Sequence, residues 1–285
     1  MIFEFRSALS HKSGTEDLLQ ECFVFGIKQA LSCLFPLFIF CMLIVSKLIT
    51  IPCLPRYDFL LIVCIAMQAF MYLSKLESGT ELLVITMFHL LGLTMELYKV
   101  KMGSWSYPEA AYSKVGGVPL YSGFMYASVG SYVCQAWRWF SLRLENWPGI
   151  GAASLVSLAI YLNFFTHHFI CDLRWVITLL LITVFWQTKF IFNSNGTERK
   201  MPLVLSFLLI GFMIWIAENM ATFLGAWKYA SQHEGWRMVS LGKISSWFLL
   251  VVLSIVIVIQ LKFIRYGKSV FSKTQPEDQS NITPC

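Results

Sequence analysis

The chain has 285 residues, of which 57% are hydrophobic and only 13% are charged. Ordinary soluble domains have about 25% charged and about 45–50% apolar residues, so this composition excludes a soluble protein that covers its surface with polar side chains. The net charge of +6 is not gathered into a basic stripe, which excludes the usual footprint of a nucleic-acid-binding protein. The sequence therefore predicts a polytopic protein embedded in a lipid bilayer.

The first predicted element is an amphipathic helix at residues 16–30. It places Leu19, Phe23 and Ile27 at four-residue spacing, which is typical of one apolar helix face. Acidic side chains within the first 28 residues argue against a cleavable signal peptide. We predict an N-terminal segment, residues 1–29, whose helix lies at the membrane interface. A cytosolic helix packed on the bundle is the alternative.

The apolar runs that follow are long enough for an all-α bundle of about eight membrane spans, because a span needs about 20 mostly apolar residues. The runs are 30–49, 58–74, 82–99, 119–140, 149–170, 173–192, 202–223 and 244–264. The second run is short and the fourth is polar, so seven spans remain possible. The transmembrane domain is predicted at 30–264, with a polar loop at 193–201 and a polar tail at 265–285. The excess of Lys and Arg on the N-terminal side puts both termini in the cytoplasm.

Two stretches of the chain repeat one pattern, and they read ELYKVKMGSWSY (Glu96–Tyr107) and ENMATFLGAWKY (Glu218–Tyr229). In each, the glutamate is followed by glycine, tryptophan and tyrosine at the same offsets. A shift of 122 residues (218 minus 96) also carries span three onto span seven and span one onto span five. Two halves of four spans enter from the same side, so they form parallel repeats about an axis along the membrane normal. Both glutamates then lie near one membrane face.

Ionisable side chains within these spans are the candidate catalytic groups, because a charge in mid-membrane costs about 2.5–3.5 kcal/mol and needs a reason. The candidates are Glu96, Glu218, His89, His168 and Asp172. His89 shares a helix face with Glu96. His168 and Asp172 are four residues apart, which suits a pair if the helix continues. We expect one shared cavity, with substrate-binding candidates Trp105, Tyr107, Trp227, Tyr229, Asn219 and His167.

Histidines and carboxylates suit zinc or iron by ligand type, but the usual metal-binding spacings are missing. On a helix, the adjacent side chains of His167 and His168 would point about 100° apart, because a turn has 3.6 residues. We therefore predict no metal site. No phosphate-binding or dinucleotide-binding loop is found, and the sequence leaves the cofactor unknown.

Four long motifs carry a family resemblance: FHLLGLTMELYKVKMGSWSYPE, GGVPLYSGFMYASVGSYVCQAWR, YLNFFTHHFICDLRW and FMIWIAENMATFLGAWKY. They resemble a family of bacterial multi-pass membrane proteins catalogued as domain of unknown function 817. The resemblance covers roughly residues 16–265. It implies a bacterial inner (plasma) membrane protein with several spans and implies no activity.

A fainter similarity is to the membrane lycopene cyclases and carotenoid hydratases, which also combine an intramembrane acid with glycine and an aromatic pair. The matching positions are Glu96, Gly103, Trp105, Tyr107, Gly117 and Pro119, and then Glu218, Gly225, Trp227 and Tyr229. The proline-acid pair expected after the second stretch is replaced by SLGKISSW.

Three functions remain open from the sequence. A membrane-embedded enzyme would use Glu96 and Glu218 to protonate a lipid or isoprenoid, with Trp105 and Trp227 stabilising a carbocation. A transporter would use the same acids, with Lys99, Lys101 and Arg174 selecting an anionic solute. A structural membrane protein would carry no chemistry. A bound lipid or isoprenoid is the partner that the first function predicts.

Overall fold

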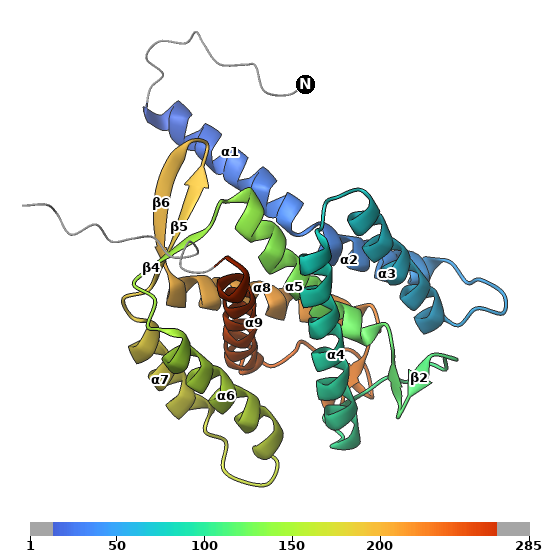
Figure 1. Ribbon diagram of the computed structural model, residues 1–285. Helices are drawn as coiled ribbons and strands as arrows, with labels where there is room; N and C mark the ends of the chain where they lie inside the picture. Colours follow the sequence, from blue (N-terminus) through green and yellow to red (C-terminus); the bar gives the residue numbers. More distant parts are fainter. Residues whose placement is uncertain (1–13, 267–285) are drawn as a thin grey trace, which may run out of the picture.

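The structure is a computed structural model that describes residues 14–266, so most of the predicted tail at 265–285 lies outside the described residues. Helices dominate this part of the chain (Figure 1). In chain order they are α1 (Gly14–Ser32), α2 (Leu34–Leu48), α3 (Arg56–Leu73), α4 (Gly79–Lys101), α5 (Ser122–Trp139), α6 (Ile150–Thr166), α7 (Arg174–Phe185), α8 (Leu203–Phe223) and α9 (Lys243–Tyr266).

Each predicted span coincides with one of the helices α2 to α9, but not all of these helices are long. Within residues 14–266, four helices are long and apolar enough to cross a membrane, namely α3, α4, α8 and α9, and the number rises to five if the bent pair α1–α2 is one span. Helices α6 and α7 are shorter. The prediction of a helical protein with several membrane-compatible helices is confirmed at that level.

Helix α1 occupies the place of the predicted amphipathic helix and meets α2 at an angle of 66°. Its apolar stripe faces away from the protein, since Leu19 is 71% exposed and Phe23 is 68% exposed. In Figure 1 the helix runs along the outside of the bundle. An exposed apolar stripe is the feature that an interfacial helix would bury in a bilayer.

The stretch predicted as a polar loop at 193–201 forms a β-hairpin instead. Strand β5 (Lys189–Ser194) pairs with β6 (Thr197–Pro202), and β4 (Arg143–Glu145) adds a third strand to β5. The turn is Asn195-Gly196 with φ values of 51° and 83°, the positive values that a tight hairpin turn requires. Because β5 begins at Lys189, α7 ends at Phe185, before the predicted limit of 192.

The connections between helices gather at two ends of the molecule. At the first end, the hairpin end, Arg199 of β6 donates two hydrogen bonds to the Glu21 carboxylate of α1, and Lys28 donates to the Asn193 carbonyl at 2.9 Å. Arg138 at the end of α5 donates to the Leu76 carbonyl of the α3–α4 connection. The connections α3–α4, α5–α6 and α7–α8 therefore share this end with α1.

The second end, called the repeat end, carries the connections α2–α3, α4–α5, α6–α7 and α8–α9. Short strands β1 (Trp105–Ser106) and β7 (Lys228–Tyr229) pair there, and β2 (Lys114–Val115) pairs with β3 (Val118–Pro119). Arg56 at the start of α3 donates to the carbonyls of Leu224 and Gly225, just beyond α8, at 2.7 and 3.2 Å. Contacts between distant connections thus hold this end together.

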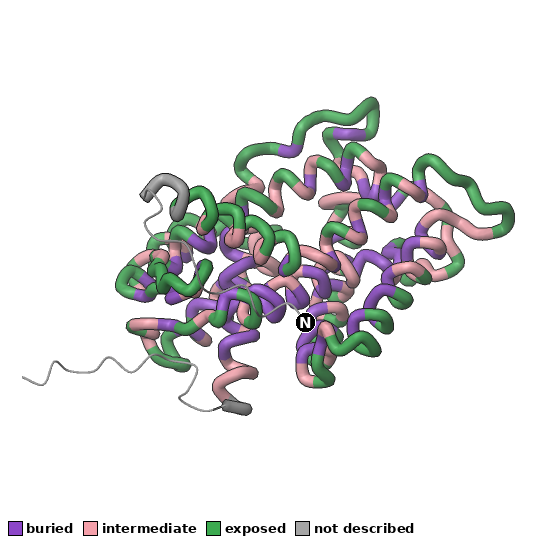
Figure 2. Tube along the Cα trace, turned by 90° about the horizontal axis from the view of Figure 1, so that it is seen from above, coloured by how far each residue is buried: buried purple, intermediate pink, exposed green. Residues whose placement is uncertain are grey.

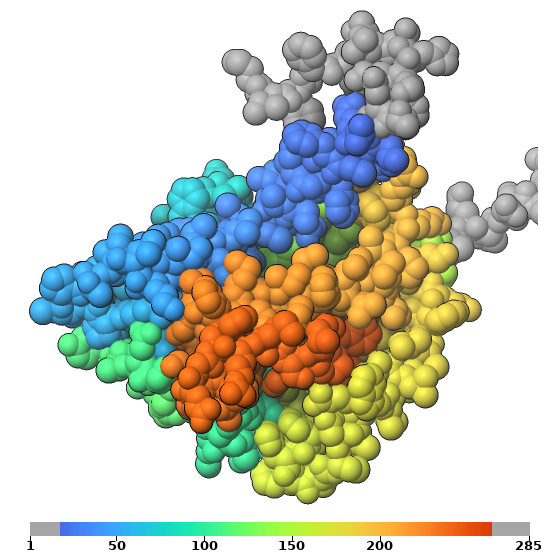
Figure 3. All heavy atoms as spheres, turned by 180° about the vertical axis from the view of Figure 1, so that it is seen from behind, coloured from blue at the N-terminus to red at the C-terminus, as the bar shows by residue number. Residues whose placement is uncertain are grey.

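Helix packing follows the same order in both halves of the chain. Helix α4 packs on α5 and α8 packs on α9, while α2 contacts α3 and α5, and α6 contacts α7 and α9. Buried residues run through the middle of the bundle (Figure 2), and α8 separates α1–α2 from α6–α7 on the face seen in Figure 3. A Cβ on Gly211 of α8 would lie 2.9 Å from the Phe248 amide of α9, so these helices approach closely.

Candidate functional site

Both repeated stretches end their helix with the same backbone motif. Gly103 follows α4 with a φ of 70°, and Gly225 follows α8 with a φ of 75°. At each end the glycine amide donates to the carbonyl three residues earlier at 3.0 Å, and the next amide donates to the carbonyl five residues earlier at 2.9 Å. These bonds define a Schellman motif, which favours glycine because other residues adopt the left-handed conformation at a cost. In both stretches, the glycine therefore turns the chain sharply away from the helix that it follows.

After these turns, the two stretches pair with each other. Trp105 lies opposite Tyr229 and Ser106 lies opposite Lys228 in the antiparallel pair β1–β7. Ser106 and Lys228 are equivalent positions in the two stretches, since they differ by 122. The pair is therefore centred on equivalent residues, with the aromatic residue of one copy facing the aromatic residue of the other.

The first carboxylate, Glu96, is held by three aromatic donors. Trp105 Nε1 and the Tyr107 hydroxyl donate to Oε2 at 2.6 and 2.8 Å, and the Tyr126 hydroxyl of α5 donates to Oε1 at 2.8 Å. Burial, and then the charge of Glu96, raise the pKa of Tyr107 well above its usual range, so this hydroxyl keeps its proton. The Glu96 side chain is thus enclosed by donors and nearly hidden from solvent.

The second carboxylate, Glu218, has an equivalent cage built from other elements. The Tyr229 hydroxyl donates to Oε1 of Glu218. Tyr229 follows Glu218 by eleven residues, as Tyr107 follows Glu96. Trp247 Nε1 of α9 donates to Oε2 at 2.6 Å. Glu218 is only 2% exposed. Trp227, also buried, hydrogen-bonds the Tyr229 side chain.

The two cages touch through their aromatic rings. The rings of Trp105 and Tyr229 meet edge to face, with centroids 5.9 Å apart. The Lys243 ammonium lies 4.7 Å from the Tyr229 ring centroid and 5.8 Å from that of Trp105. These are cation–π distances, so the faces of this aromatic pair already hold a positive charge.

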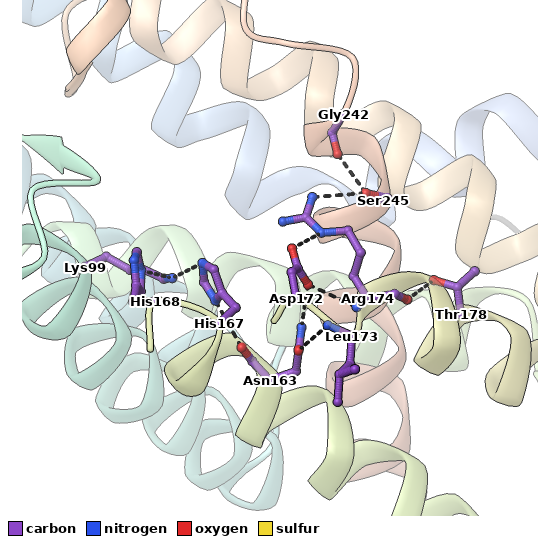
Figure 4. Close-up of polar contacts among 10 residues, drawn as sticks. All are labelled: Lys99, Asn163, His167, His168, Asp172, Leu173, Arg174, Thr178, Gly242 and Ser245. Carbon is purple, nitrogen blue, oxygen red and sulfur yellow. Dashed lines mark hydrogen bonds and ion pairs between the residues drawn. The ribbon is translucent and has the colours of Figure 1, made fainter. Parts of the chain in front are cut away.

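A second group, the Lys99 cluster, consists of Lys99, His167 and His168 (Figure 4). Lys99 Nζ lies 3.2 Å from His167 Nε2 and 2.9 Å from His168 Nε2. An ammonium only donates, so both Nε2 atoms accept and both rings carry their proton on Nδ1. His167 Nδ1 lies 3.0 Å from the Asn163 carbonyl, which fits that tautomer.

The two histidines share one partner because α6 ends at Thr166, before either of them. Their ring centroids are 4.2 Å apart, so the expectation that the rings diverge by about 100° was wrong. Burial, and then the charges of Lys99, His167 and Lys243, lower the pKa of His168 below its ordinary value. Among residues 14–266, no group of three or more His, Cys, Asp or Glu side chains is arranged to hold a metal ion.

Asp172 stands beside this cluster and does not pair with His168, because the helix does not continue to it. Its carboxylate accepts from Arg174 Nε at 2.6 Å and from Asn163 Nδ2 at 3.1 Å (Figure 4). Burial alone would raise the pKa of Asp172, but the hydrogen bonds from Asn163 and Arg174 hold it below its ordinary value. Asp172 therefore fixes the loop between α6 and α7.

His89 and Asn219 lie apart from both groups. His89 packs on Phe124 with ring centroids 4.5 Å apart, and its buried Nδ1 atom has no hydrogen-bond partner in the part of the chain that the structure describes. Asn219 donates to the Trp215 carbonyl and accepts from the Val239 amide, both within 2.9 Å. Asn219 thus joins α8 to the loop before α9.

Three residues of the site escaped the sequence analysis. Tyr126 and Trp247 complete the two carboxylate cages, and Lys243 lies between them. Adding 122 to the position of Tyr126 gives 248, one residue from Trp247, so the repeat carried a signal for this pair. Lys99 was named only as a residue that would select an anionic solute in a transporter, because nothing in its neighbourhood along the chain pointed to His167 or His168.

Comparisons with known proteins give a family but no activity. The model of a family described as "Protein of unknown function (DUF817)" matches residues 21–255. The chain is similar to "Uncharacterized protein YoaT" of Bacillus subtilis (strain 168), with 59% identity over 241 residues that cover 85% of this chain and 91% of that protein. No solved structure matches the chain.

Proposed function

The chain belongs to the protein family of unknown function DUF817, and we propose that it is a membrane-embedded enzyme that exchanges a proton with a lipid or isoprenoid substrate. The single observation that carries the proposal is the pair of buried carboxylates, Glu96 and Glu218, in cages that meet at one aromatic contact. A carboxyl group in a water-excluded site can act as general acid, and a carboxylate can act as general base.

Two features of the cages suit this chemistry. Tyr126 and Tyr229 can donate to a carboxylate and can accept from a carboxylic acid, so each cage tolerates both protonation states. The ring faces of Trp105 and Tyr229 stabilise the Lys243 ammonium, and the same faces would stabilise positive charge on a substrate. One glutamic acid then protonates a polyene carbon, and the other carboxylate removes a proton from an adjacent carbon.

We also propose eight membrane crossings in two parallel four-helix repeats, with both termini in the cytoplasm of a bacterial cell. The sorting of connections between the hairpin end and the repeat end supports an alternating path of α2 to α9. The 122-residue shift carries α4 (79–101) to 201–223, close to α8, and carries α5 (122–139) to 244–261, within α9. Matching helix contacts in the two halves support the same arrangement.

A second candidate function is a structural clamp, and a specific observation favours it. Every oxygen of the Glu96 and Glu218 carboxylates already accepts a hydrogen bond from the protein. Such satisfied buried groups stabilise and specify a fold. In this function the glutamates join α4 and α8 through β1 and β7 and take part in no reaction.

Deuterium uptake separates the two functions. Membranes containing the protein are incubated in D₂O, and the lipids that purify with it are examined by mass spectrometry. The enzyme incorporates deuterium at carbon in a bound lipid or isoprenoid, and Glu96→Gln and Glu218→Gln abolish the uptake. Glu234→Gln is the control, because Glu234 is exposed on the same side of the protein and its side chain is 91% accessible. Equal deuterium uptake in the wild type and in both Gln variants would contradict the enzyme and favour the structural clamp.

A further inference from the structure

We propose that Lys99, His167 and His168 form a binding site for a phosphate group. Arg174 and Lys243 lie close enough to act on it electrostatically. The site is separate from the two carboxylate cages and its proposal requires no proton transfer by Glu96 or Glu218. The phosphate can belong to a lipid headgroup or to a free phosphate.

The first argument is an excess of positive charge. Lys99 is only 4% exposed, and among the side chains that the structure describes, residues 18–263, none forms an ion pair with its ammonium within 4 Å. Its near neighbours are two imidazoles and the Phe164 ring, whose centroid lies 4.3 Å away. A buried ammonium without a counter-charge is costly, and an anion removes that cost.

The charge of Asp172 acts on Lys99 from a distance, but Asp172 does not form an ion pair with it. Asp172 is engaged by Arg174 at 2.6 Å and by the Asn163 amide group. The Lys243 ammonium contacts the ring faces of Trp105 and Tyr229, and in the described part of the chain it too has no carboxylate within 4 Å. The charge of Glu218 acts on Lys243 from a distance. Lys99 and Lys243 thus lie close enough to act on each other electrostatically, and neither forms an ion pair within the described residues.

The second argument is the type and direction of the donors. Both Nε2 atoms turn to the Lys99 ammonium, so an oxyanion that binds this ammonium also meets the two imidazole edges (Figure 4). His168 is neutral at pH 7 because its surroundings disfavour a second positive charge. A bound dianion favours the protonated form of His168, and this ring then donates a charge-assisted hydrogen bond to a phosphate oxygen.

The third argument is the surface around the cluster. His168 is exposed, so a ligand can reach it. The loop and helix beside it present large apolar side chains, namely Phe169 (72% exposed), Ile170 (56%), Leu173 (41%) and Trp175 (70%). Aromatic and apolar residues at a helix end are typical of the membrane interface, where lipid phosphates lie. This surface favours a phosphate carried by a lipid.

The test uses the full chain in phosphatidylcholine nanodiscs, with binding of added phosphatidic acid measured by native mass spectrometry. We expect the wild type to prefer phosphatidic acid to phosphatidylcholine by about tenfold or more, since a charge-assisted hydrogen bond is worth roughly that factor. Lys99→Gln and His168→Gln should each lose about that preference. Lys101→Gln is the matched control, because Lys101 is an exposed lysine two residues away on the same helix end.

Inorganic phosphate identifies the source of the phosphate group. If it displaces phosphatidic acid at millimolar concentration, the site also serves free phosphate compounds; if it does not, the site is specific for lipid. The proposal is overturned if the wild type does not discriminate between phosphatidic acid and phosphatidylcholine. It is also overturned if Lys101→Gln loses as much binding as Lys99→Gln.

Three variants distinguish loss of binding from loss of stability or of proton chemistry. His168→Gln changes an exposed loop residue, so it reports on binding even if Lys99→Gln lowers stability. Glu96→Gln and Glu218→Gln should retain full phosphatidic acid binding. Failure of the proton chemistry and failure of the phosphate site are therefore separate outcomes.

Discussion

At the scale of single residues, the central feature is a carboxylate whose donors are all aromatic. Indole N–H and phenol O–H groups place apolar rings around a charge, so each satisfies a hydrogen bond and also excludes water. The two glutamates differ in how they are held. Glu96 accepts from three side chains, two of them within its own repeated stretch, whereas Glu218 accepts from two.

The tyrosine hydroxyls of the cages should contribute measurably to stability. Tyr107→Phe and Tyr229→Phe each remove a donor to a buried carboxylate, and each should lower the free energy of unfolding by about 1–3 kcal/mol. Unfolding in mixed detergent micelles with increasing SDS measures this change. Tyr112→Phe is the control, because Tyr112 is 83% exposed. A change equal to the control in both variants would contradict the hydrogen bonds described here.

The protonation of His168 should respond to the charge of Lys99. The pKa of His168 lies below its ordinary value because of burial first, and then because of the positive charges of Lys99, His167 and Lys243. Removing one of those charges makes protonation easier, so Lys99→Gln should raise the pKa of His168 while Lys101→Gln should leave it unchanged. Imidazole resonances followed against pH by NMR measure both. A pKa that falls in Lys99→Gln would contradict the arrangement.

At the scale of elements, the repeat acts through the ends of two helices. The seven-residue offset from glutamate to glycine puts the carboxylate two turns before the end of the helix. The Schellman turn then reverses the chain, and a tyrosine eleven residues after the glutamate comes back to meet it. The distance along the chain thus follows from helix geometry, which is why the pattern recurs at the same spacing in both stretches.

Both of these helix ends should depend on glycine. Gly103→Ala and Gly225→Ala force an L residue into a left-handed conformation, so each should destabilise the protein by about 1–2 kcal/mol. The Gly103 position has open space for a Cβ, which assigns the loss to the backbone alone. Gly26→Ala is the opposing control: it lies inside α1 with open space around it and should stabilise by up to about 1 kcal/mol. Equal effects at all three positions would contradict this account.

At the scale of the whole molecule, the chain alternates between its two ends, and this predicts the side from which each connection can be reached. One additional cysteine is introduced at a time, at Asn195 in the hairpin turn or at Glu234 in the α8–α9 connection. Cells that contain each variant are treated with a membrane-impermeant thiol reagent. We expect the Asn195→Cys protein to react only in opened cells and the Glu234→Cys protein to react in intact cells, above the labelling of the parent protein. Reaction of both from the same side would refute the alternating path.

How much of this architecture can be predicted from the sequence depends on the range of the interactions. The positions of the helices follow from local apolar runs, and the meeting of Glu96 with Tyr107 follows from their spacing. The contributions of Tyr126 and Trp247 come from helices packed alongside, so no local pattern contains them. The Lys99 cluster depends on α6 ending at Thr166, whereas apolar residues continue beyond it and indicate a longer helix.

The hairpin shows a different kind of failure. Asn195 and Gly196 form a dipeptide that favours a tight turn, and this signal is present in the sequence. The polar residues of the turn and of β6 suggested an irregular loop, and the apolar residues Phe190 to Phe192 of β5 were included in the preceding predicted span. The third strand comes from elsewhere in the chain, since Glu145 of β4 pairs with Lys189, 44 residues further on (189 minus 145).

The register of β1 and β7 has a consequence for ancestry. Because the two strands meet at equivalent positions, either strand could pair with a duplicate of itself in the same alignment, as in an isologous dimer interface. Under the proposed four-helix repeat, a gene encoding one half would have made a self-complementary subunit. Fusion of two such genes would then have freed each glutamate cage to diverge, and Glu96 and Glu218 now have unequal donors.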